Sequence, residues 1–419
     1  MTETITLPQM EQVPISELKA DGQNPNKLDR KGLDRLKRSI QQYGFIVPII
    51  TNKDLLIADG EQRWIAANEL AMKEVSVIRL PVEDVDRRLL RQVLNKLRGE
   101  HELLADALEF EKIIELGRED DLKFLLDLND SKLERYLREL HPPKDEDYEI
   151  PEIEKIHTDI KRGDIIQLGK HRLMCGDSCL KENVDQLMNG NKANMIMTDP
   201  PYGVNYAGKN EFLNKMDKGN RIQTGYANDS IKDYPKFIHD WMLNFPLADY
   251  NTIYIWTGNY QLFTILQEAE NQGLHLPISL VWVKNNHVLT RQDYYAKHEL
   301  CLYGWKNHHK FYGEGTRTTV LLFDKPLVND LHPTMKPIEL IAYLIPDGSR
   351  VDDIVYDSFG GSGSTLIACE QTGRVCYMME IDPRYCEIIC QRWEKYTGQK
   401  RKLIEKPSII GEQNATTNA

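Results

Sequence analysis

Hydrophobic positions follow two patterns along the chain, short apolar runs and helical spacing, and the first 140 residues contain both. Short apolar runs such as "VPIIT" and "LLIA" predict strands, whereas Leu33, Leu36 and Ile40 recur at helical spacing and Gly44 ends that helix. Residues 81–140 are charged and helix-periodic throughout. This part of the chain therefore predicts a few short strands and helices followed by a small helical bundle.

Residues 141–155 interrupt these patterns. They contain three prolines and many carboxylates but few apolar residues, which predicts a linker. Beyond them, strand-like runs alternate with polar loops and helical segments. We expect strands at 165–177, 193–199, 250–258, 276–285 and 299–306, then a strand, a glycine loop, a helix, a strand and a helix within 331–405. Such alternation predicts an open, mostly parallel α/β sheet, with a disordered tail at 406–419.

Composition places the chain among globular proteins. Its 419 residues are 41% hydrophobic and 28% charged, which allows two or three domains. No stretch approaches the roughly 20 apolar residues of a membrane span, and the N-terminus lacks a secretory signal, so we expect a cytoplasmic protein without a membrane partner. The seven cysteines form no C-x-x-C pair, so neither a disulfide framework nor a metal site is expected.

Charge changes this picture only locally. The net charge of -11 argues against a protein that coats nucleic acid with its whole surface. Residues 284–325, however, contain seven Lys or Arg against four Asp or Glu. A mildly basic face can therefore exist on an acidic protein.

A glycine loop provides the first candidate for ligand binding. In "YDSFGGSGSTLIA", Gly360, Gly361 and Gly363 lie between a strand and a helix, where the backbone can approach a ligand closely. The loop lacks the Gly-Lys-Ser/Thr ending of a triphosphate-binding loop. Glu380 follows Gly360 by twenty positions, where an acidic side chain can reach a ribose. A nucleoside without a phosphate chain fits both observations, and a structural turn is the alternative.

A second motif ends the apolar run 193–198 with the tetrapeptide Asp199, Pro200, Pro201 and Tyr202. Together with the later glycine loop, this "DPPY" resembles the S-adenosylmethionine-dependent amino-methyltransferases of DNA, in the motif order of their β class. "CGDS", "SLVWVKN", "KHELCLYGWK" and "HPTMKP" stand in the expected order, and the resemblance covers roughly residues 160 to 400. It implies a Rossmann-like domain with a mostly parallel sheet at 156–405 and a target recognition region at about 205–330.

The resemblance also assigns roles to residues, with S-adenosylmethionine as the cofactor. It implies that the glycine loop and its flanking residues contact this cofactor, with Glu380 on the ribose hydroxyls. It places Thr334 and Lys336 near the cofactor's carboxylate and Asp177 near its adenine. The implied cofactor residues are Asp177, Thr334, Lys336, Asp357, Phe359, Gly360, Gly361, Gly363 and Glu380.

The chemistry of the tetrapeptide follows from its residue types. An exocyclic amine on a base is a poor nucleophile because its lone pair is delocalised into the ring. The Asp199 carboxylate and the Pro200 carbonyl can each accept one N–H, which orients the lone pair. The fixed φ angles of Pro200 and Pro201 hold that carbonyl, and Tyr202 offers a stacking face for a flipped base. Direct attack on the methyl group then needs no covalent enzyme intermediate. A capped, purely structural turn is the alternative.

The resemblance favours adenine N6 as the acceptor, because aspartate at the first motif position is typical of adenine enzymes. Cytosine N4 is the alternative acceptor. Duplex DNA is the expected partner, a homodimer is one option for the assembly, and the sequence identifies no restriction endonuclease partner. A hypothesis from another class is a DNA-binding partition or regulatory protein whose methylase half only binds the cofactor.

The N-terminal zone has a resemblance of its own. "PISELKADGQNPNK", "LLIADGEQRWIAANEL" and "VSVIRL" resemble the ParB/sulfiredoxin-like fold of chromosome-partitioning proteins. This implies a small α+β domain at 1–85 and a helical extension at 86–140. In the family, the segment that matches "DGEQR" faces a nucleotide or phosphate, here through Gly60, Glu61 and Arg63. Because "LNKLRGEH" matches the second nucleotide segment only in part, we favour a DNA-contacting or self-associating module over nucleotide binding or a structural relic.

Overall fold

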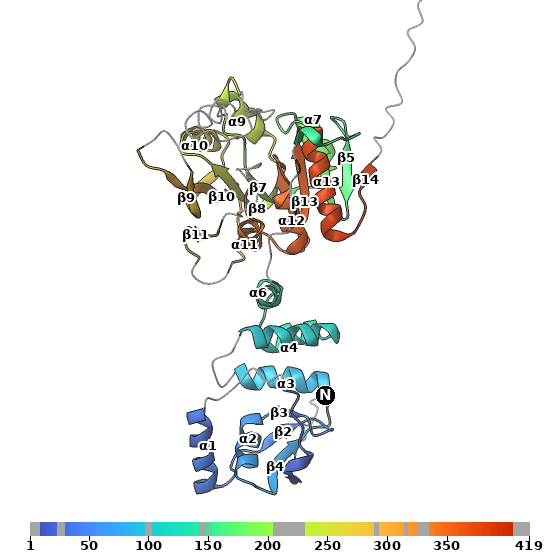
Figure 1. Ribbon diagram of the computed structural model, residues 1–419, viewed down its shortest axis with the longest axis vertical. Helices are drawn as coiled ribbons and strands as arrows, with labels where there is room; N and C mark the ends of the chain where they lie inside the picture. The colour runs from blue at the N-terminus through green and yellow to red at the C-terminus, as the bar shows by residue number, and fades with distance from the viewer. Residues whose placement is uncertain are drawn as a thin grey trace, which may run out of the picture. The chain divides into compact units, whose positions relative to one another are not determined.

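The computed structural model divides the chain into two compact units, residues 1–142 and 143–419. It describes residues 9–22, 30–96, 103–141, 148, 151, 153–203, 231–288, 293–313, 317–324 and 335–404. Figure 1 shows the course of both units. The predicted tail at 406–419 and residues 204–230 of the predicted target recognition region lie outside the described residues.

Unit 1 begins with a four-stranded sheet in the order β1-β4-β2-β3. Strands β1 (Met10–Pro14) and β4 (Glu74–Arg79) are antiparallel, β4 and β2 (Ile49–Thr51) are parallel, and β2 and β3 (Ile57–Asp59) are antiparallel. A 3-10 turn, η1 (Ile15–Glu17), and helices α1 (Arg30–Tyr43) and α2 (Glu61–Glu69) accompany the sheet. Valines and isoleucines of alternate strand positions fill its core.

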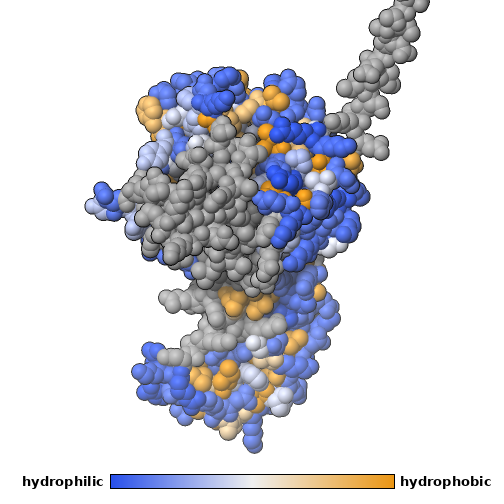
Figure 2. Space-filling model, turned by 45° about the horizontal axis from the view of Figure 1, so that its top comes forward, coloured by the Kyte–Doolittle hydropathy of each residue, from blue (hydrophilic) through white to orange (hydrophobic). Residues whose placement is uncertain are grey.

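Four helices complete unit 1, as the helical periodicity of residues 81–140 predicts. They are α3 (Asp84–Lys96), α4 (Leu103–Glu115), α5 (Glu119–Leu126) and α6 (Asp130–Leu140). Their apolar faces meet around Leu89, Phe110, Ile113 and Leu122, all of them buried. Some large apolar side chains on these helices remain exposed, and Phe124 is 85% exposed. On the face seen in Figure 2, hydrophilic residues predominate among those coloured, and hydrophobic ones form separate spots.

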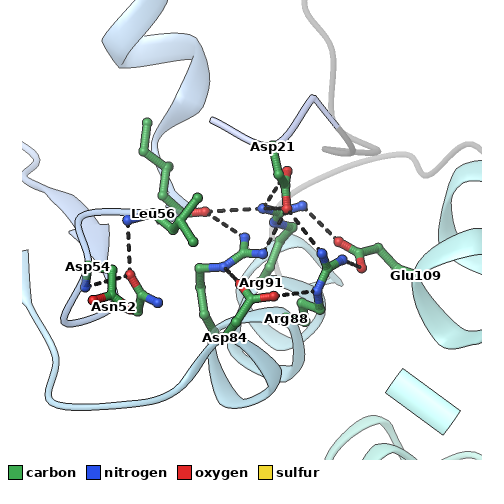
Figure 3. A network of polar contacts seen from close by, with 10 residues as sticks. Asp21, Asn52, Asp54, Leu56, Asp84, Arg88, Arg91 and Glu109 are labelled. Carbon is green, nitrogen blue, oxygen red and sulfur yellow. Dashed lines mark hydrogen bonds and ion pairs between the residues drawn. The ribbon is translucent and has the colours of Figure 1, made fainter. Parts of the chain in front are cut away.

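A buried network of charged side chains ties α3 and α4 to the sheet of unit 1 (Figure 3). Glu109 on α4, 1% exposed, accepts hydrogen bonds from Arg88 at 2.5 Å and from Arg91 at 2.7 Å. Arg91 also donates to Asp21 at 2.9 Å and to the carbonyl of Ile57 on β3 at 3.1 Å. Each buried charge in this network has a partner of opposite sign. Removal of one member therefore leaves a buried charge without compensation, which destabilises the fold.

We expect Glu109→Ala to destabilise unit 1 by about 3 kcal/mol, because two buried guanidinium groups lose a shared carboxylate. Hydrogen–deuterium exchange of the full chain would measure this as faster exchange in peptides of α3 and α4. Glu115→Ala is the matched control on the same helix, because Glu115 is 58% exposed in its pair with Lys112. A surface pair contributes about 0–1 kcal/mol. Equal effects of the two substitutions would contradict the structural role of the network.

Unit 2 contains a 10-stranded sheet in the order β11-β9-β10-β8-β7-β12-β13-β6-β5-β14. The strands β8, β7, β12, β13 and β6 are mutually parallel in the centre, and only β10 and β5 run opposite to the rest. Their bounds are β5 (Ile165–Leu168), β6 (His171–Cys175), β7 (Ala193–Thr198), β8 (Leu247–Thr257), β9 (His275–Val288), β10 (Ala296–Trp305), β11 (Val320–Leu322), β12 (Ile354–Asp357), β13 (Val375–Glu380) and β14 (Lys402–Ile404). The mostly parallel α/β sheet is therefore confirmed.

Helices cover both faces of this sheet. One face packs against α7 (Lys181–Met188), α9 (Tyr234–Leu243) and α10 (Leu262–Asn271). The other packs against α11 (Ile338–Gly348), α12 (Ser364–Gln371) and α13 (Pro383–Thr397), and the short η2 (Ile153–Lys155) precedes the sheet. Neighbouring residues of β7 point to opposite faces, so Met195 and Met197 join one core and Ile196 the other. This double coverage explains why the strand sequences read as continuous apolar runs.

One predicted strand is wrong. The apolar run 165–177 folds as a hairpin, in which β5 and β6 pair antiparallel from Ile165–Met174 to Leu168–His171. The turn lies at Gly169, whose φ of 57° is a conformation that glycine adopts without strain. Elsewhere the rings of Trp282 and Tyr303 are buried in the sheet core. Across the described ranges, no helix combines the length and the apolarity that a bilayer crossing requires.

Candidate active site

The chemistry-bearing motifs meet at one edge of the central sheet. Strands β7, β12, β13 and β6 are parallel neighbours, so their carboxyl ends lie side by side. Asp199 follows β7, Asp357 ends β12, Glu380 ends β13 and Asp177 follows β6. In open α/β sheets this edge is where ligands bind. Segments far apart in the sequence are thus brought to one place.

The glycine loop makes the connection between β12 and α12. Gly363 stands at the N-terminal cap of α12 with φ 85°, a left-handed conformation that favours glycine. A side chain at Gly360 would meet the sulfur of Met378 at 2.8 Å, so the backbone packs directly on β13. The amide of Gly360 donates to the carbonyl of Met379 at 2.7 Å. The loop is therefore fixed against the next strand and exposes its backbone toward the cavity.

Two carboxyl groups flank this loop, that of Asp357 buried and that of Glu380 half-buried. Glu380 accepts hydrogen bonds from the amides of Gly361 and Asp382, both at 2.9 Å. Asp357, 3% exposed, accepts from the amide of Phe359 at 3.0 Å. Burial raises the pKa of each of these two carboxyl groups to about 7, although the hydrogen bonds to them act in the opposite direction.

The tetrapeptide Asp199 to Tyr202 lies on the other side of the same cavity. The Tyr202 hydroxyl donates to Asp199 Oδ1 at 2.9 Å, and the Tyr202 carbonyl accepts from the side-chain amide of Gln261 at 2.6 Å. Pro200 is buried and Pro201 is half-buried. Gln261 lies next to the start of α10, so the segment is held both by its own residues and by the neighbouring strand–helix connection.

Lys336 connects Asp199 to a second carboxylate. Its Nζ forms an ion pair with Asp199 Oδ2 and lies 3.1 Å from Glu299 Oε2. The side chain of Lys336 is only 6% exposed, and the ring of Trp256 lies 5.2 Å from its Nζ. The structure therefore places the ammonium group of Lys336 against the Asp199 carboxylate.

A cavity of about 330 Å³ joins the two sides. Of the predicted site residues, Asp177, Asp199, Pro201, Lys336, Asp357, Phe359, Gly360, Gly361 and Glu380 line it, as does Asp382. Pro200, Tyr202 and Gly363 are chain neighbours of these, and Thr334 lies outside the described residues. Among the described residues that line the cavity, Lys336 alone is basic. The cavity is therefore acidic, which suits a ligand with positive charge.

Sequence reasoning missed three side chains at this site. Glu299 on β10 and Lys284 on β9 form an ion pair behind Lys336, and Gln261 holds Tyr202. Glu299 and Lys284 lie within "KHELCLYGWK" and "SLVWVKN", which served above as family markers without roles for single residues. A charged residue at the edge of an apolar run was the available signal, with Lys284 after residues 280–283 and Glu299 before residues 300–303.

In unit 1, the predicted phosphate contacts lie at the start of α2. Gly60 is the N-terminal cap of this helix and Glu61 is its first residue. Arg63 donates from Nη2 to Asp59 at 2.7 Å and to the carbonyl of Pro48 at 3.3 Å. Both bonds come from Nη2, whereas the buried Nε of Arg63 has no hydrogen-bond partner among the described residues. Of the second, partly matching segment, Arg98 lies outside the described residues.

Comparison with known proteins finds a family match within each of the two units. Residues 193–391 match the family described as DNA methylase, and residues 1–93 match the ParB N-terminal domain. The chain is 24% identical over 247 residues to the Type II methyltransferase M2.MboI of Moraxella bovis, covering 52% of this chain and 89% of that protein. It is 24% identical over 248 residues to M.HpaI of Haemophilus parainfluenzae, covering 53% and 73%.

The crystal structure of the M1.HpyAVI–SAM complex is similar with a TM-score of 0.39 and 21% identity, covering 52% of this chain and 98% of that one. Each of the two family matches lies within one of the units described above. The chain therefore combines a region that matches the DNA methylases, residues 193–391, with a region that matches the ParB N-terminal domain, residues 1–93.

Proposed function

We propose that this protein transfers a methyl group from S-adenosylmethionine to the N6 amine of adenine in duplex DNA. The observation that carries the proposal is that Asp199 and the glycine loop line the same acidic cavity. The match of residues 193–391 to the DNA methylases supports the reaction class. The order of the motifs, with the tetrapeptide first and the glycine loop last, supports the β class.

The cavity fits S-adenosylmethionine. When bound, this cofactor supplies a methyl group on a positively charged sulfonium, and its amino group adds a second positive charge. Asp357 and Glu380 provide carboxylates for such a ligand, and the backbone of Gly360 and Gly361 can approach it closely. Phe359 packs against Phe237 and Trp241 at ring distances of 5.9 Å and 5.3 Å, which forms an apolar wall. We infer that Asp177 lies at the adenine end.

Asp199 and the backbone of Pro200 act on the acceptor amine. Each accepts one N–H, which turns the nitrogen lone pair away from the ring and toward the methyl group. As the new N–C bond forms, the ionised Asp199 stabilises the positive charge on the nitrogen and can accept the proton that the amine loses. Tyr202, fixed by Gln261, holds the face of the flipped base.

The remaining parts of the chain supply DNA recognition in this proposal. Residues from about 205 to 330 would read the target sequence, and unit 1 would act as a DNA-contacting or self-associating module. The ion pair of Arg63 with Asp59 favours this role over nucleotide binding, because the carboxylate already offsets the charge that a phosphate would need.

The proposal is tested by incubating the full chain with labelled S-adenosylmethionine and mixed-sequence duplex DNA. Digestion of the DNA to nucleosides and mass spectrometry then identify the methylated base. We expect N6-methyldeoxyadenosine, at a level that Tyr202→Phe lowers only in part, because the variant keeps the ring but loses the hydroxyl bond to Asp199.

The other outcomes separate the alternative functions. N4-methyldeoxycytidine as the product would overturn the choice of adenine while keeping the reaction class. Transfer to RNA but not to DNA would overturn the substrate. Cofactor binding without transfer to any nucleic acid would favour a regulatory protein whose methylase half is inactive.

A further inference from the structure

Four charged side chains form a row of alternating sign that begins at the candidate catalytic carboxylate. Asp199 pairs with Lys336, Lys336 lies 3.1 Å from Glu299, and Glu299 pairs with Lys284. Lys336 and Lys284 are 6% and 5% exposed, and Glu299 is 21% exposed. The charges of this row sum to zero. Of these four residues, only Asp199 and Lys336 line the cavity. Glu299 and Lys284 therefore influence Asp199 from outside the cavity lining.

The elements that carry the row are rigid. Glu299 belongs to β10 and Lys284 to β9, strands that pair antiparallel beside the parallel centre. Lys336 lies two positions before the first residue of α11, a helix whose apolar face is buried in the core. Trp256 lies 5.2 Å from the ammonium of Lys336, and Trp282 lies 4.9 Å from that of Lys284. Both rings are buried, so they shield the lysines from water.

Burial and the neighbouring charges both shift the pKa values of the two carboxyl groups in this row. Burial raises the pKa of Asp199, Lys336 opposes that rise, and Glu299 reinforces it. For Glu299, burial is outweighed by Lys336 and Lys284, which together lower its pKa to about 2. Glu299 is therefore a fixed negative charge at every pH of interest. It competes with Asp199 for the single ammonium group of Lys336.

We propose that Lys336 and Glu299 are positioning residues for the methyl transfer, with Lys336 keeping Asp199 ionised and Glu299 limiting how strongly Lys336 neutralises it. This inference rests on the proposed function only in that Asp199 is the group acting on the amine. It gives Lys336 a role different from a contact with the cofactor carboxylate. An ionised Asp199 accepts hydrogen bonds from an amine, whereas a protonated one offers a donor in that place.

Other titratable groups also face Asp199. They are the Tyr202 hydroxyl, the Tyr234 hydroxyl of α9, Cys301 of β10 and Asp357 of β12. Substitutions at Lys336 and Glu299 leave all of them in place. A difference between the two variants in the titration of Asp199 can therefore be assigned to the charges of Lys336 and Glu299.

The test uses two neutral variants of the full chain, Lys336→Gln and Glu299→Gln. Carbon-13 NMR of protein labelled at the aspartate carboxyl carbons follows the titration, and the resonance missing from Asp199→Asn belongs to Asp199. We expect Lys336→Gln to move the titration of Asp199 up by about one pH unit or more, because it removes a positive charge. Glu299→Gln should move it down, because it removes a negative charge. The acid limb of kcat should shift in the same two directions.

Two further variants serve as controls. Lys336→Arg keeps the charge and should restore the wild-type titration. Lys170→Gln should leave it unchanged, because Lys170 is 38% exposed in a surface pair with Asp352. These two variants separate an effect of the charge at Lys336 from a general effect of substituting a lysine.

The inference is overturned if both neutral variants move the titration in the same direction, or if neither moves it. A raised Kd for S-adenosylmethionine in Lys336→Gln, with the titration of Asp199 unchanged, would instead make Lys336 a cofactor ligand. The NMR titration needs no turnover. If the wild-type protein transfers no methyl group, the proposed function is therefore contradicted. The NMR titration would still test the inference about Lys336 and Glu299 in that case.

Discussion

Asp199→Asn is expected to lower kcat for methyl transfer about 10²- to 10³-fold, the usual loss when one preorganised group at a developing charge is removed. The amide is the same size as the carboxylate, but it offers one acceptor and turns an N–H donor toward either Lys336 or the amine. The affinity for S-adenosylmethionine should remain nearly unchanged, because the glycine loop and Glu380 stand on other strands. Single-turnover kinetics and titration calorimetry measure the two quantities separately.

The control for this experiment is Tyr202→Phe. This variant removes the 2.9 Å hydrogen bond to Asp199 but keeps the carboxylate and the aromatic ring. We expect it to lose far less activity than Asp199→Asn. If Asp199→Asn weakens cofactor binding as much as it slows transfer, Asp199 is a structural residue and the proposed mechanism is wrong.

Asp357→Asn is expected to make the cofactor-free protein more stable while weakening its affinity for the cofactor. Burial raises the pKa of Asp357 to about 7, against 3.8 for the free group, so the folded protein holds its proton more tightly than the unfolded chain. The loss of folding stability caused by the buried charge of Asp357 is therefore absent near pH 4, grows as the pH rises and is complete above pH 7. From the size of the shift, it is on the order of 2–4 kcal/mol at pH 8.

Thermal unfolding of wild type and variant at a series of pH values between 5 and 8 tests this. We expect the advantage of Asp357→Asn in Tm to be larger at pH 8 than at pH 5. Asp347→Asn is a control with the opposite sign, because Asp347 is also 3% exposed but accepts a 2.7 Å hydrogen bond from Arg317. Breaking that pair should destabilise the protein. A loss of stability in both variants would mean that Asp357 has a structural role.

The positions of Asp199, Asp357 and Glu380 at the ends of parallel strands could be predicted from the sequence, because each one ends an apolar run. Parallel strands then bring such ends to a common edge whatever the order of the strands. The glycine loop was equally visible, since its glycines separate a strand from a helix. In unit 1, the helical spacing of residues 81–140 likewise predicted α3 to α6.

The partners of Lys336 could not be predicted in the same way. Lys336 meets Asp199 across 137 positions of sequence, and Glu299 reaches it from a strand whose place in the sheet no local pattern fixes. The hairpin at Gly169 was missed for a related reason. An apolar run interrupted by Gly-Lys is equally compatible with one bent strand and with two paired strands. The pairing of β5 with β14 and with β6 distinguishes the two possibilities.

The site takes one carboxylate from each of four adjacent strands, and this links ligand binding to folding. The amide of Gly176, next to Asp177, bonds to the carbonyl of Glu380 at 2.8 Å, across more than half of unit 2 in sequence. No fragment of that sheet holds the whole site. A ligand that binds only the complete arrangement adds its binding free energy to the stability of all of these strands, about 2.7 kcal/mol at a hundred times its Kd. The cofactor is in this sense a structural element of unit 2 as well as its reagent.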